Sequence, residues 1–561
     1  MLRALYLLLI LICVVPTIPG LVGVFASAFS YIPPLKLYSV NLSGFTQVWA
    51  WSGVWKSIGL TIVTALVSLV LTIVITFSIL SSAWGQSLWS KVEASLSPML
   101  AIPHVAFTIG LAFLLSPTGV IARLVEPVLG NDIFGWFVRD PFGIGLILAL
   151  TLKEIPFLLL MSIPTLKQLR VDESRKVAYS LGYDSSAFWW KCVFPQWLEK
   201  IRFPVIAIIA FSASVVDVSL IIGPTNPPTF SVLVFQWFSE PDLSLMPRAA
   251  AGALLLFIIC TALILIVRAI EWLLLKKIRD WQFSGRRTIS LPGKSLYLTV
   301  GGLFIATLLT TLVWSIAKRW RFPDLVPSST SLQFWGTELP GITPIITESL
   351  NIAFVSATVA LVLALIAHEY RIKYRLAIPS YVIAIPMLVP QLSLLFGMQV
   401  TTLYISSDYY YLWVVWSHVF FAFPYIYLSL DGPWRSFNPA YMHTASSLGK
   451  SPINAWLKVK LPQLYSAVLY AWAIGTSVSL AQYLPTLMLG NGRISTLTTE
   501  AVALASGYDR RVTAIYAIWQ TLVPFIIFAA VVLINRQNGV KIKTKGIIIN
   551  HEPISKEPHR L

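Results

Sequence analysis

The chain has 561 residues, of which 57% are hydrophobic and only 12% are charged, and its formal net charge is +17. A soluble fold of this length could not bury so much apolar surface, so the composition excludes a water-soluble protein and predicts an all-α polytopic membrane protein. The three cysteines, Cys13, Cys192 and Cys260, are scattered. Their spacing matches neither a metal site nor a disulfide framework.

In chain order, twelve apolar segments are long enough to cross a bilayer, which takes about 20 helical residues each. They lie near residues 5–29, 57–80, 95–115, 142–163, 203–222, 247–275, 296–316, 349–368, 376–398, 411–430, 466–485 and 511–535. The first of them begins after Arg3 and ends at Ala26-Ser27-Ala28, which imitates a cleavable signal peptide. Its apolar run exceeds the usual 7–15 residues of such a peptide, so we expect a retained first helix.

The basic residues are distributed unevenly between the two ends of these spans. If Met1 lies inside, about 29 of the 41 Lys and Arg fall on the inner face, and this bias predicts that both termini are cytoplasmic. We therefore expect a multi-pass protein of the bacterial inner membrane. Its positive charge reports orientation in the lipid bilayer and does not indicate a nucleic-acid partner.

One stretch of the sequence occurs twice. Residues 177–196 read VAYSLGYDSSAFWWKCVFPQ, and residues 444–463, offset by 267 positions, read TASSLGKSPINAWLKVKLPQ. Further similar pairs, such as LAIPHVAFTIGLAFLL and YVIAIPMLVPQLSLLFG, extend the likeness over most of the chain. Six spans per unit return the chain to the same side, so the units are parallel repeats. We predict an N-terminal half at 1–275, a basic cytoplasmic linker at 276–295, a C-terminal half at 296–546 and a tail at 547–561.

Each copy of the repeated stretch is expected on the cytoplasmic face, between the fourth and fifth spans of its half. A helical run leads into a glycine, a short amphipathic piece follows, and a proline ends it. The pattern predicts a helix that lies across the membrane face and exposes aromatic side chains, namely Phe188, Trp189 and Trp190 in one copy and Trp456 in the other. Two such surfaces favour docking to a partner that has two equivalent binding sites. The alternative is an interfacial helix that rests on lipid headgroups.

The repeated stretch resembles the EAA loop of the permeases of binding-protein-dependent ABC importers. The matching residues are Ala178, Leu181, Gly182 and Pro195 in the first copy and Ala445, Leu448, Gly449 and Pro462 in the second. At the Glu position of the family motif this chain has Lys176 and His443, and the first Ala of the motif is Val177 and Thr444. The pairing of that Glu with an ATPase therefore does not transfer to this chain.

By this resemblance, the chain is a fused two-half permease of the thiamine- or iron(III)-importer type, and each half has the type I importer fold. The resemblance implies two copies of an ATP-binding subunit docked on the two loops, and a periplasmic solute-binding protein that delivers a small molecule or ion. It also implies that the chain is a transport subunit and not an enzyme. No cofactor is expected.

Two Gly-Lys-Ser triplets, at 293–295 and 449–451, imitate a phosphate-binding loop, but Thr288 and Thr444 occupy the positions of the required upstream glycine. Polar residues inside the spans are more informative, because a charge in the bilayer costs about 3 kcal/mol and needs a partner or a wet cavity. Glu154, Asp217 and Gln482 are the candidate lining of a solute pathway, and Lys153 and His418 are further polar positions in spans. For Glu154 and Asp217 a structural role is an equal alternative, and for His418 the structural role is favoured. The six histidines show no ligand spacing, so no metal site is expected.

Two other classes compete with the importer. Twelve spans in parallel repeats also describe a secondary transporter driven by an ion gradient, but the loop between spans two and three lacks the Gly/Asp/Arg-rich motif usual in that group. A lipid- or glycan-modifying membrane enzyme would require a polar catalytic cluster on an outer loop, and the sequence shows none. The transported solute does not follow from these residues.

Overall fold

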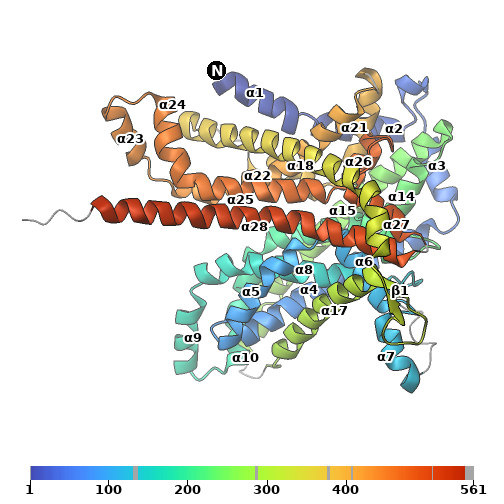
Figure 1. The fold of residues 1–561 in the computed structure, drawn as a ribbon, viewed down its shortest axis with the longest axis horizontal. Helices are drawn as coiled ribbons and strands as arrows, with labels where there is room; N and C mark the ends of the chain where they lie inside the picture. Colours follow the sequence, from blue (N-terminus) through green and yellow to red (C-terminus); the bar gives the residue numbers. More distant parts are fainter. Residues whose placement is uncertain are drawn as a thin grey trace, which may run out of the picture.

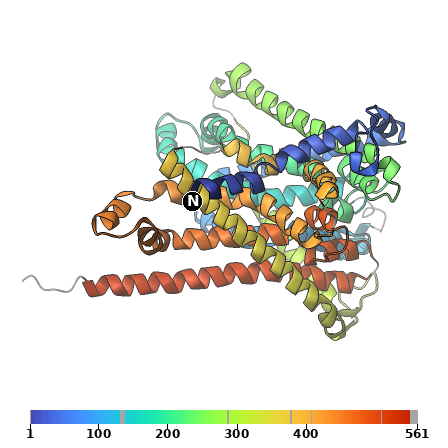
Figure 2. The same cartoon turned by 90° about the horizontal axis from the view of Figure 1, so that it is seen from above.

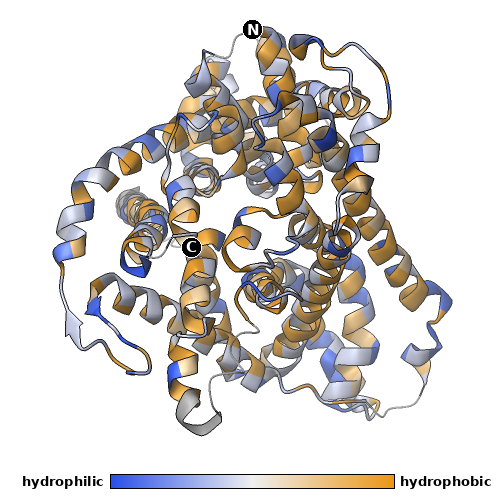
Figure 3. Cartoon of the chain, turned by 90° about the vertical axis from the view of Figure 1, so that its right-hand side faces the viewer, coloured by the Kyte–Doolittle hydropathy of each residue, from blue (hydrophilic) through white to orange (hydrophobic). Residues whose placement is uncertain are grey.

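The computed structural model describes residues 2–129, 137–284, 288–375, 379–405, 408–507 and 509–549. The chain is an all-α polytopic membrane protein, and a two-stranded hairpin is the only sheet in the described part. Hydrophobic residues occur along all the long helices (Figure 3). Exposed leucines, isoleucines and valines lie along α4, α15, α17 and α18, as expected of helices that face lipid.

The N-terminal set of helices runs from α1 to α15. Its bounds are α1 Leu2–Cys13, α2 Thr17–Ala28, α3 Ser43–Ala50, α4 Val54–Ala83, α5 Ser87–Ala101, α6 His104–Leu115, α7 Val120–Leu129, α8 Ile144–Gln168, α9 Val171–Ser180, α10 Ser185–Ala187, α11 Phe194–Lys200, α12 Arg202–Ser214, α13 Asp217–Ile222, α14 Phe230–Phe238 and α15 Met246–Trp272. Short 3-10 turns lie at Pro33–Leu35 and Leu243–Leu245, and π-helical turns at Phe188–Val193 and Leu273–Lys277. The short helix α16, Asp280–Phe283, follows in the predicted linker.

The C-terminal set runs from α17 to α28. Its bounds are α17 Gly293–Ile316, β1 Ala317–Arg319, β2 Ser329–Thr330, α18 Gln333–Tyr374, α19 Ser380–Ile383, α20 Ile385–Leu388, α21 Gln391–Ile405, α22 Tyr410–Ser436, α23 Ala440–Ser447, α24 Pro452–Ala455, α25 Leu461–Leu480, α26 Leu484–Leu489, α27 Leu497–Ala505 and α28 Arg510–Ile549, with a π-helical turn at Trp456–Lys460. Strands β1 and β2 are antiparallel, with Ala317 opposite Thr330.

Nine helical segments of the described residues are long and apolar enough to span a membrane. Three predicted spans are divided into shorter helices. Span 203–222 consists of α12 and α13, and span 466–485 falls on α25 and α26. Span 376–398 contains α19, α20 and the start of α21, and its residues 376–378 lie outside the described part. The predicted span 95–115 is interrupted before His104, and α6 begins there. The number twelve therefore stays a prediction.

The breaks in α12–α13 and α25–α26 are stabilised in the same way. The Ser231 hydroxyl of α14 donates to the Val215 carbonyl (2.9 Å), and the Thr498 hydroxyl of α27 donates to the Leu480 carbonyl (2.5 Å). Ser231 and Thr498 are separated by 267 residues, the offset of the sequence repeat. A carbonyl released from a helix inside a bilayer needs such an internal donor, because no water replaces it there.

One helix near the start of each set, α2 in the N-terminal set and α17 in the C-terminal set, packs against the opposite set. Helix α2 packs on α21, and α17 packs on α6. Glycines permit both close approaches: a Cβ atom on Gly397 of α21 would lie 1.9 Å from the Gly20 carbonyl oxygen, and one on Gly110 of α6 would lie 2.4 Å from Thr311 Oγ1. Such small-residue contacts are typical of packed membrane helices, where backbones approach closely.

Figures 1 and 2 show the resulting bundle, with its spans running along the long axis. Helices α9, α10, α23 and α24 lie at one end, together with the start of α1 and the far end of α28 (Figure 1). Helices α3, α7, α14 and strand β1 lie at the opposite end (Figure 1). We name these the loop end and the hairpin end of the bundle.

Substituting Gly397→Leu should destabilise the packing of α2 on α21, because the added side chain meets backbone and cannot be accommodated by a rotamer change. Overpacking of this kind costs about 1–3 kcal/mol. We expect a lower midpoint of thermal unfolding and a smaller monodisperse fraction in detergent. Gly302→Leu on α17 is the control, since no atom lies within 4 Å of the position that a Cβ would take there. Equal stability of the two variants would contradict the close α2–α21 contact.

Candidate functional site: two loop helices and a polar cluster between the helix sets

The first repeated loop lies at the loop end of the bundle and contains α9, Gly182 and α10. Gly182 has φ +79°, a left-handed conformation that glycine adopts without a steric penalty. The Asp184 side chain then caps α10 by accepting from the Ala187 backbone N–H (2.9 Å). The chain thus turns sharply between two short helices, as the sequence predicts.

The second loop repeats this construction with α23, Gly449 and α24. Gly449 has φ +73°, Ser451 caps α24 by accepting from the Asn454 N–H (3.4 Å), and Pro452 follows in the first turn. Pro is favoured there because its missing N–H would have no helical partner. In both loops the short helix continues through a π-helical turn into the next span.

The structure places the eight motif residues in matched environments. Ala178 and Ala445 are buried, whereas Leu181 and Leu448 are 59% and 74% exposed. Pro195 and Pro462 lie in the first turns of α11 and α25. The prediction that these prolines end the amphipathic piece is therefore wrong, because the helical path continues through them.

The prediction of exposed aromatic residues is also wrong for the first loop. Phe188 and Trp189 are buried, and Trp190 is half-buried. The two tryptophan rings pack around Phe77 of α4, whose ring centroid lies 6.0 Å from that of Trp189 and 5.1 Å from that of Trp190, and Phe188 contacts Trp189. The amphipathic piece turns its aromatic face toward the bundle, where burial of large rings is most favourable. The exposed apolar surface is mainly aliphatic, with Val177 and Leu181 in the first loop and Leu448 and Ile453 in the second, and each loop adds one exposed tyrosine, Tyr179 or Tyr441.

In the second loop, Trp456 is half-buried and is bound to a buried hub around Glu369 of α18. The Glu369 Oε1 atom accepts from Trp434 Nε1 and Trp456 Nε1, at 3.0 Å each, and from Lys460 Nζ. Lys460 is itself buried, and its charge is paired with Glu369. This hub attaches the second loop firmly to α18 and α22.

The linker between the helix sets lies against the first loop. The Ile289 carbonyl accepts from Ser186 Oγ and Trp190 Nε1, both at 2.9 Å, and Lys191 Nζ donates to the Trp281 carbonyl. Lys294 and Ser295, from the first Gly-Lys-Ser triplet, start α17 and line a pocket of about 470 Å³ beside this contact. The two loops therefore differ: the described linker covers one flank of the first loop and makes none of these bonds with the second.

Replacing Trp190→Phe should loosen the linker, because the ring is retained while the hydrogen bond to the Ile289 carbonyl is lost. One such bond contributes about 0.5–1.5 kcal/mol. We expect the backbone amides of residues 288–291 to exchange with deuterium several-fold faster, as read by mass spectrometry. Trp472→Phe, which removes an indole bond to Thr358 on a different surface, serves as the control. Unchanged exchange in the Trp190 variant would show that the linker is held by other contacts.

Inside the spans, Lys153 and Glu154 point to different partners, as expected for neighbours on a helix. Lys153 Nζ donates to the carbonyls of Met99 (3.1 Å) and Ile102 (2.6 Å), where α5 ends and α6 has not yet begun. Glu154 Oε1 lies 3.6 Å from His104 Nε2. Lys153 therefore closes a helix break, while Glu154 belongs to a separate group of titratable residues.

This polar cluster consists of Glu154, Asp217, His104, Tyr425 and Tyr483. Asp217 starts α13 directly after the break in the span, and it interacts electrostatically with His104 and with Tyr483. Glu154 interacts in the same way with Tyr425. Two carboxylates and a histidine of the N-terminal set thus lie near enough to two tyrosines of the C-terminal set to interact electrostatically.

Three members of the polar cluster, His104, Tyr425 and Tyr483, were not expected from the sequence. The sequence feature that could have indicated them is a polar residue directly after a proline within an apolar segment, as at His104 after Pro103 and Tyr425 after Pro424. Tyrosine is common in apolar segments, so only the packing of the two sets identifies the two tyrosines.

Gln482 and His418 occupy different kinds of site. Gln482 is 6% exposed, and neither its amide nitrogen nor its oxygen has a hydrogen-bond partner among the described residues. His418 is buried, with ring nitrogens 2.7 Å from Ser479 Oγ and 2.9 Å from Thr486 Oγ1, so it links α22 to α25 and α26. The described residues include no group of three His, Cys, Asp or Glu side chains arranged to hold a metal ion.

Two matched loops at one end of a membrane-spanning bundle, with polar residues buried between two helix sets, define a membrane transport subunit. No family model matches the chain. It is 32% identical over 481 residues to the inner membrane ABC transporter permease protein YnjC of Escherichia coli K12, and the match covers 82% of this chain and 84% of that protein. The spermidine/putrescine transport system permease protein PotC homolog of Mycoplasma genitalium is 24% identical over 229 residues, 40% of this chain and 78% of that relative.

The chain therefore belongs to the family of ABC transporter permeases. It is a multi-pass inner-membrane permease subunit of an ABC importer and not a secondary transporter. Permeases of this family work with separate ATP-binding subunits, so the chain is a transport subunit and not an enzyme.

Proposed function

We propose that the two loops each dock on one copy of an ATP-binding subunit, and that the hairpin end receives a periplasmic solute-binding protein. The observation that carries this proposal is the matched exposure of Leu181 and Leu448 beside left-handed glycines at the same end of the bundle. A large exposed apolar patch marks an interaction site, and Val177 adds to Leu181 in the first loop as Ile453 adds to Leu448 in the second. Two loops of one construction suit two copies of one partner.

The proposed domain organisation is two permease halves, 1–275 and 296–546, joined by the linker 276–295, with a tail at 547–561. Helices α13 and α26, and likewise α14 and α27, have equal lengths and the offset of the sequence repeat. The PotC homolog supports the same organisation. Its match covers 78% of its own length but only 40% of this chain, so about one half of this chain corresponds to most of that protein. Residues 550–561 of the tail lie outside the described part.

We place both termini in the cytoplasm. The start of α1 and the far end of α28 lie at the loop end of the bundle (Figure 1). This is the end where the loops would meet ATP-binding subunits, which work in the cytoplasm. The excess of Lys and Arg expected on the same face agrees with this orientation.

The proposed solute pathway runs between the helix sets and is lined by Glu154, Asp217 and Gln482. The polar cluster draws residues from both sets, so a relative movement of the sets changes its geometry. Gln482 has unpaired amide groups, which a passing solute or water can satisfy. Both broken spans place polar residues where a helix ends, as in membrane transporters with discontinuous helices.

The double variant Leu181→Glu plus Leu448→Glu should lose ATPase association, because two charges replace the exposed aliphatic contacts. Neither leucine is packed in the bundle, so insertion and thermal stability should stay unchanged. The expected result is at least a tenfold loss of co-purified ATP-binding subunit, measured by quantitative mass spectrometry of the purified complex.

The matched control is Leu325→Glu plus Leu332→Glu, two exposed leucines of the hairpin-end loop between α17 and α18. This control should retain the ATP-binding subunits at about two per permease. If both double variants retain them equally, the loops are not the docking surface.

Substituting Asp217→Asn should reduce ATP-driven solute uptake in proteoliposomes while the ATP-binding subunits stay bound. The amide keeps the size of the carboxylate but removes its charge from the polar cluster, where it acts on His104. We expect a drop of tenfold or more with the cognate solute. Glu93→Gln, an exposed change at the loop end, is the control. Wild-type uptake by the Asp217 variant would assign that residue a structural role only.

A further inference from the structure

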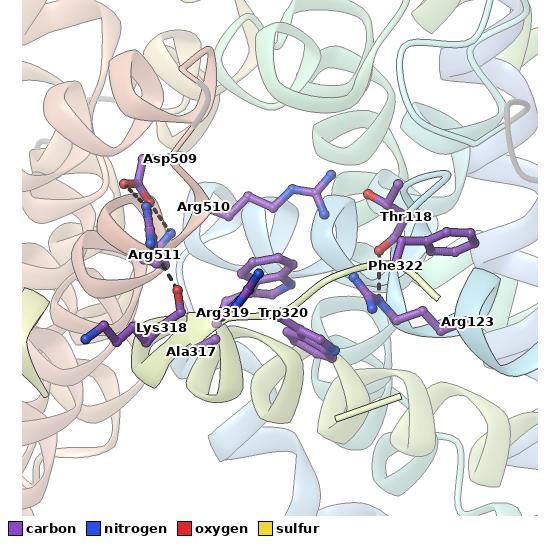
Figure 4. Close-up of a pocket in the computed structure, with 11 residues that line it drawn as sticks. Thr118, Arg123, Ala317, Lys318, Arg319, Trp320, Phe322, Asp509, Arg510 and Arg511 are labelled. Atoms are coloured by element: carbon purple, nitrogen blue, oxygen red, sulfur yellow. Dashed lines mark hydrogen bonds and ion pairs between the residues drawn. The ribbon is translucent and has the colours of Figure 1, made fainter. Parts of the chain in front are cut away.

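At the hairpin end, a pocket of about 440 Å³ lies between the two helix sets (Figure 4). The N-terminal set contributes Thr118, in the turn before α7, and Arg123 of α7. The C-terminal set contributes the end of α17, strand β1 and the start of α28. The pocket is separate from the polar cluster of the proposed pathway and from both loops, and it shares no residue with them.

The lining carries a large excess of positive charge. It includes five cationic side chains and one carboxylate, and the cations are Arg123, Lys318, Arg319, Arg510 and Arg511. The carboxylate is Asp509, which is already used: it accepts from Arg511 Nε at 2.9 Å and from the Arg511 terminal amino group at 2.8 Å. These hydrogen bonds from Arg511 hold the pKa of Asp509 below its usual range, so Asp509 stays ionised and paired.

The other cations are not neutralised in this way. No ion pair to Lys318, Arg319 or Arg510 occurs among the described residues, and Arg510 and Arg123 are close enough to repel each other. Arg123 is 2% exposed; its Nε donates to the Thr118 carbonyl (3.1 Å), and one terminal amino group donates to the carbonyls of Arg321 and Asp324. The Asp324 carboxylate acts electrostatically on Arg123 but does not line the pocket.

Aromatic rings hold the guanidinium groups of Arg123 and Arg510 in position. Arg510 lies over the Trp314 ring (5.1 Å to the centroid), and Arg123 lies over the Trp320 ring (4.7 Å). The two indole rings also contact each other, with centroids 4.8 Å apart. Figure 4 shows Arg510 extended between the Asp509–Arg511 pair on one side and Thr118 and Arg123 on the other. Such preorganised guanidiniums bind oxyanions without a large loss of side-chain entropy.

The corresponding place in the N-terminal set has no such excess among the residues described there. Near the start of α15, Arg248 forms an ion pair with Glu240 and lies over Trp237. The fold therefore does not require a cationic pocket where such a helix begins. In the described residues of these two places, the excess of positive charge is found only at the start of α28, in the C-terminal set.

We propose that this pocket binds a phosphate-bearing anion. A phosphate group presents several oxygens to several guanidiniums at once, which suits a site with four cations that lack a lining carboxylate. Two sources share this chemistry: a free phosphate compound in the outer solution, or the headgroup of an anionic lipid. The second suits the geometry because Leu308, Leu309 and Leu312 of α17 form an exposed apolar surface that leads to Trp314. Binding would link the two helix sets at the hairpin end.

The test uses the purified full chain with its ATP-binding subunits and two probes. Cardiolipin binding is measured by native mass spectrometry, and inorganic phosphate binding by isothermal titration calorimetry. For the probe that binds, Arg510→Gln should raise the dissociation constant about tenfold or more. Arg319→Gln, at an exposed strand position that does not affect folding, should raise it about threefold. Lys36→Gln, a change to a cation of another hairpin-end loop, should have no effect.

The two probes distinguish the sources: specific cardiolipin binding assigns a lipid site, and specific phosphate binding with no preference for cardiolipin assigns a soluble anion. The proposal is overturned if neither probe binds, or if all three variants bind as the wild type does. Loss of ATPase association in the loop variants would not alter this result, so the two proposals fail independently.

Discussion

The structure depends on the requirement that every backbone polar group inside a bilayer finds a partner within the protein. Continuous helices meet it without help, but the spans that carry Asp217 and Gln482 are broken. Ser231 and Thr498 satisfy carbonyls at the two breaks, and Lys153 does the same between α5 and α6. Polar residues can therefore lie at mid-membrane positions only where neighbouring helices cover them. The proposed pathway therefore lies beside the helix breaks, because polar side chains and interrupted backbone both need cover from neighbouring helices.

The exchange of first helices explains why the two sets form one unit. Helix α2 packs on α21 and α17 packs on α6, so each set is completed by a helix of the other. The contact requires small residues at Gly20, Gly110 and Gly397, since any side chain there meets backbone or a threonine. The two sets therefore pack closely at these crossings, with the polar cluster between them and the loops at one end.

The two loops share a construction but not an environment. The second loop is attached through the Glu369 hub to α18 and α22, whereas the first is packed around Phe77 and flanked by the linker. Identical partner subunits would therefore meet two surfaces with the same turn geometry and different neighbours. A single chain that contains both halves can maintain such a difference, because each loop has its own sequence.

The sequence by itself determined the class of fold, the repeat and the loop motif, because these depend on local information: apolar length, the 267-residue offset, and glycines at left-handed turns. Only the tertiary structure decided which face of each amphipathic piece is exposed. Trp189 turns inward against Phe77, more than a hundred residues earlier in the chain, and Phe188 packs against Trp189. It also decided that Glu154 and Asp217 both interact with His104 and act electrostatically on tyrosines of the other set. Such contacts join residues far apart in the chain, and their energies depend on packing that local patterns do not encode.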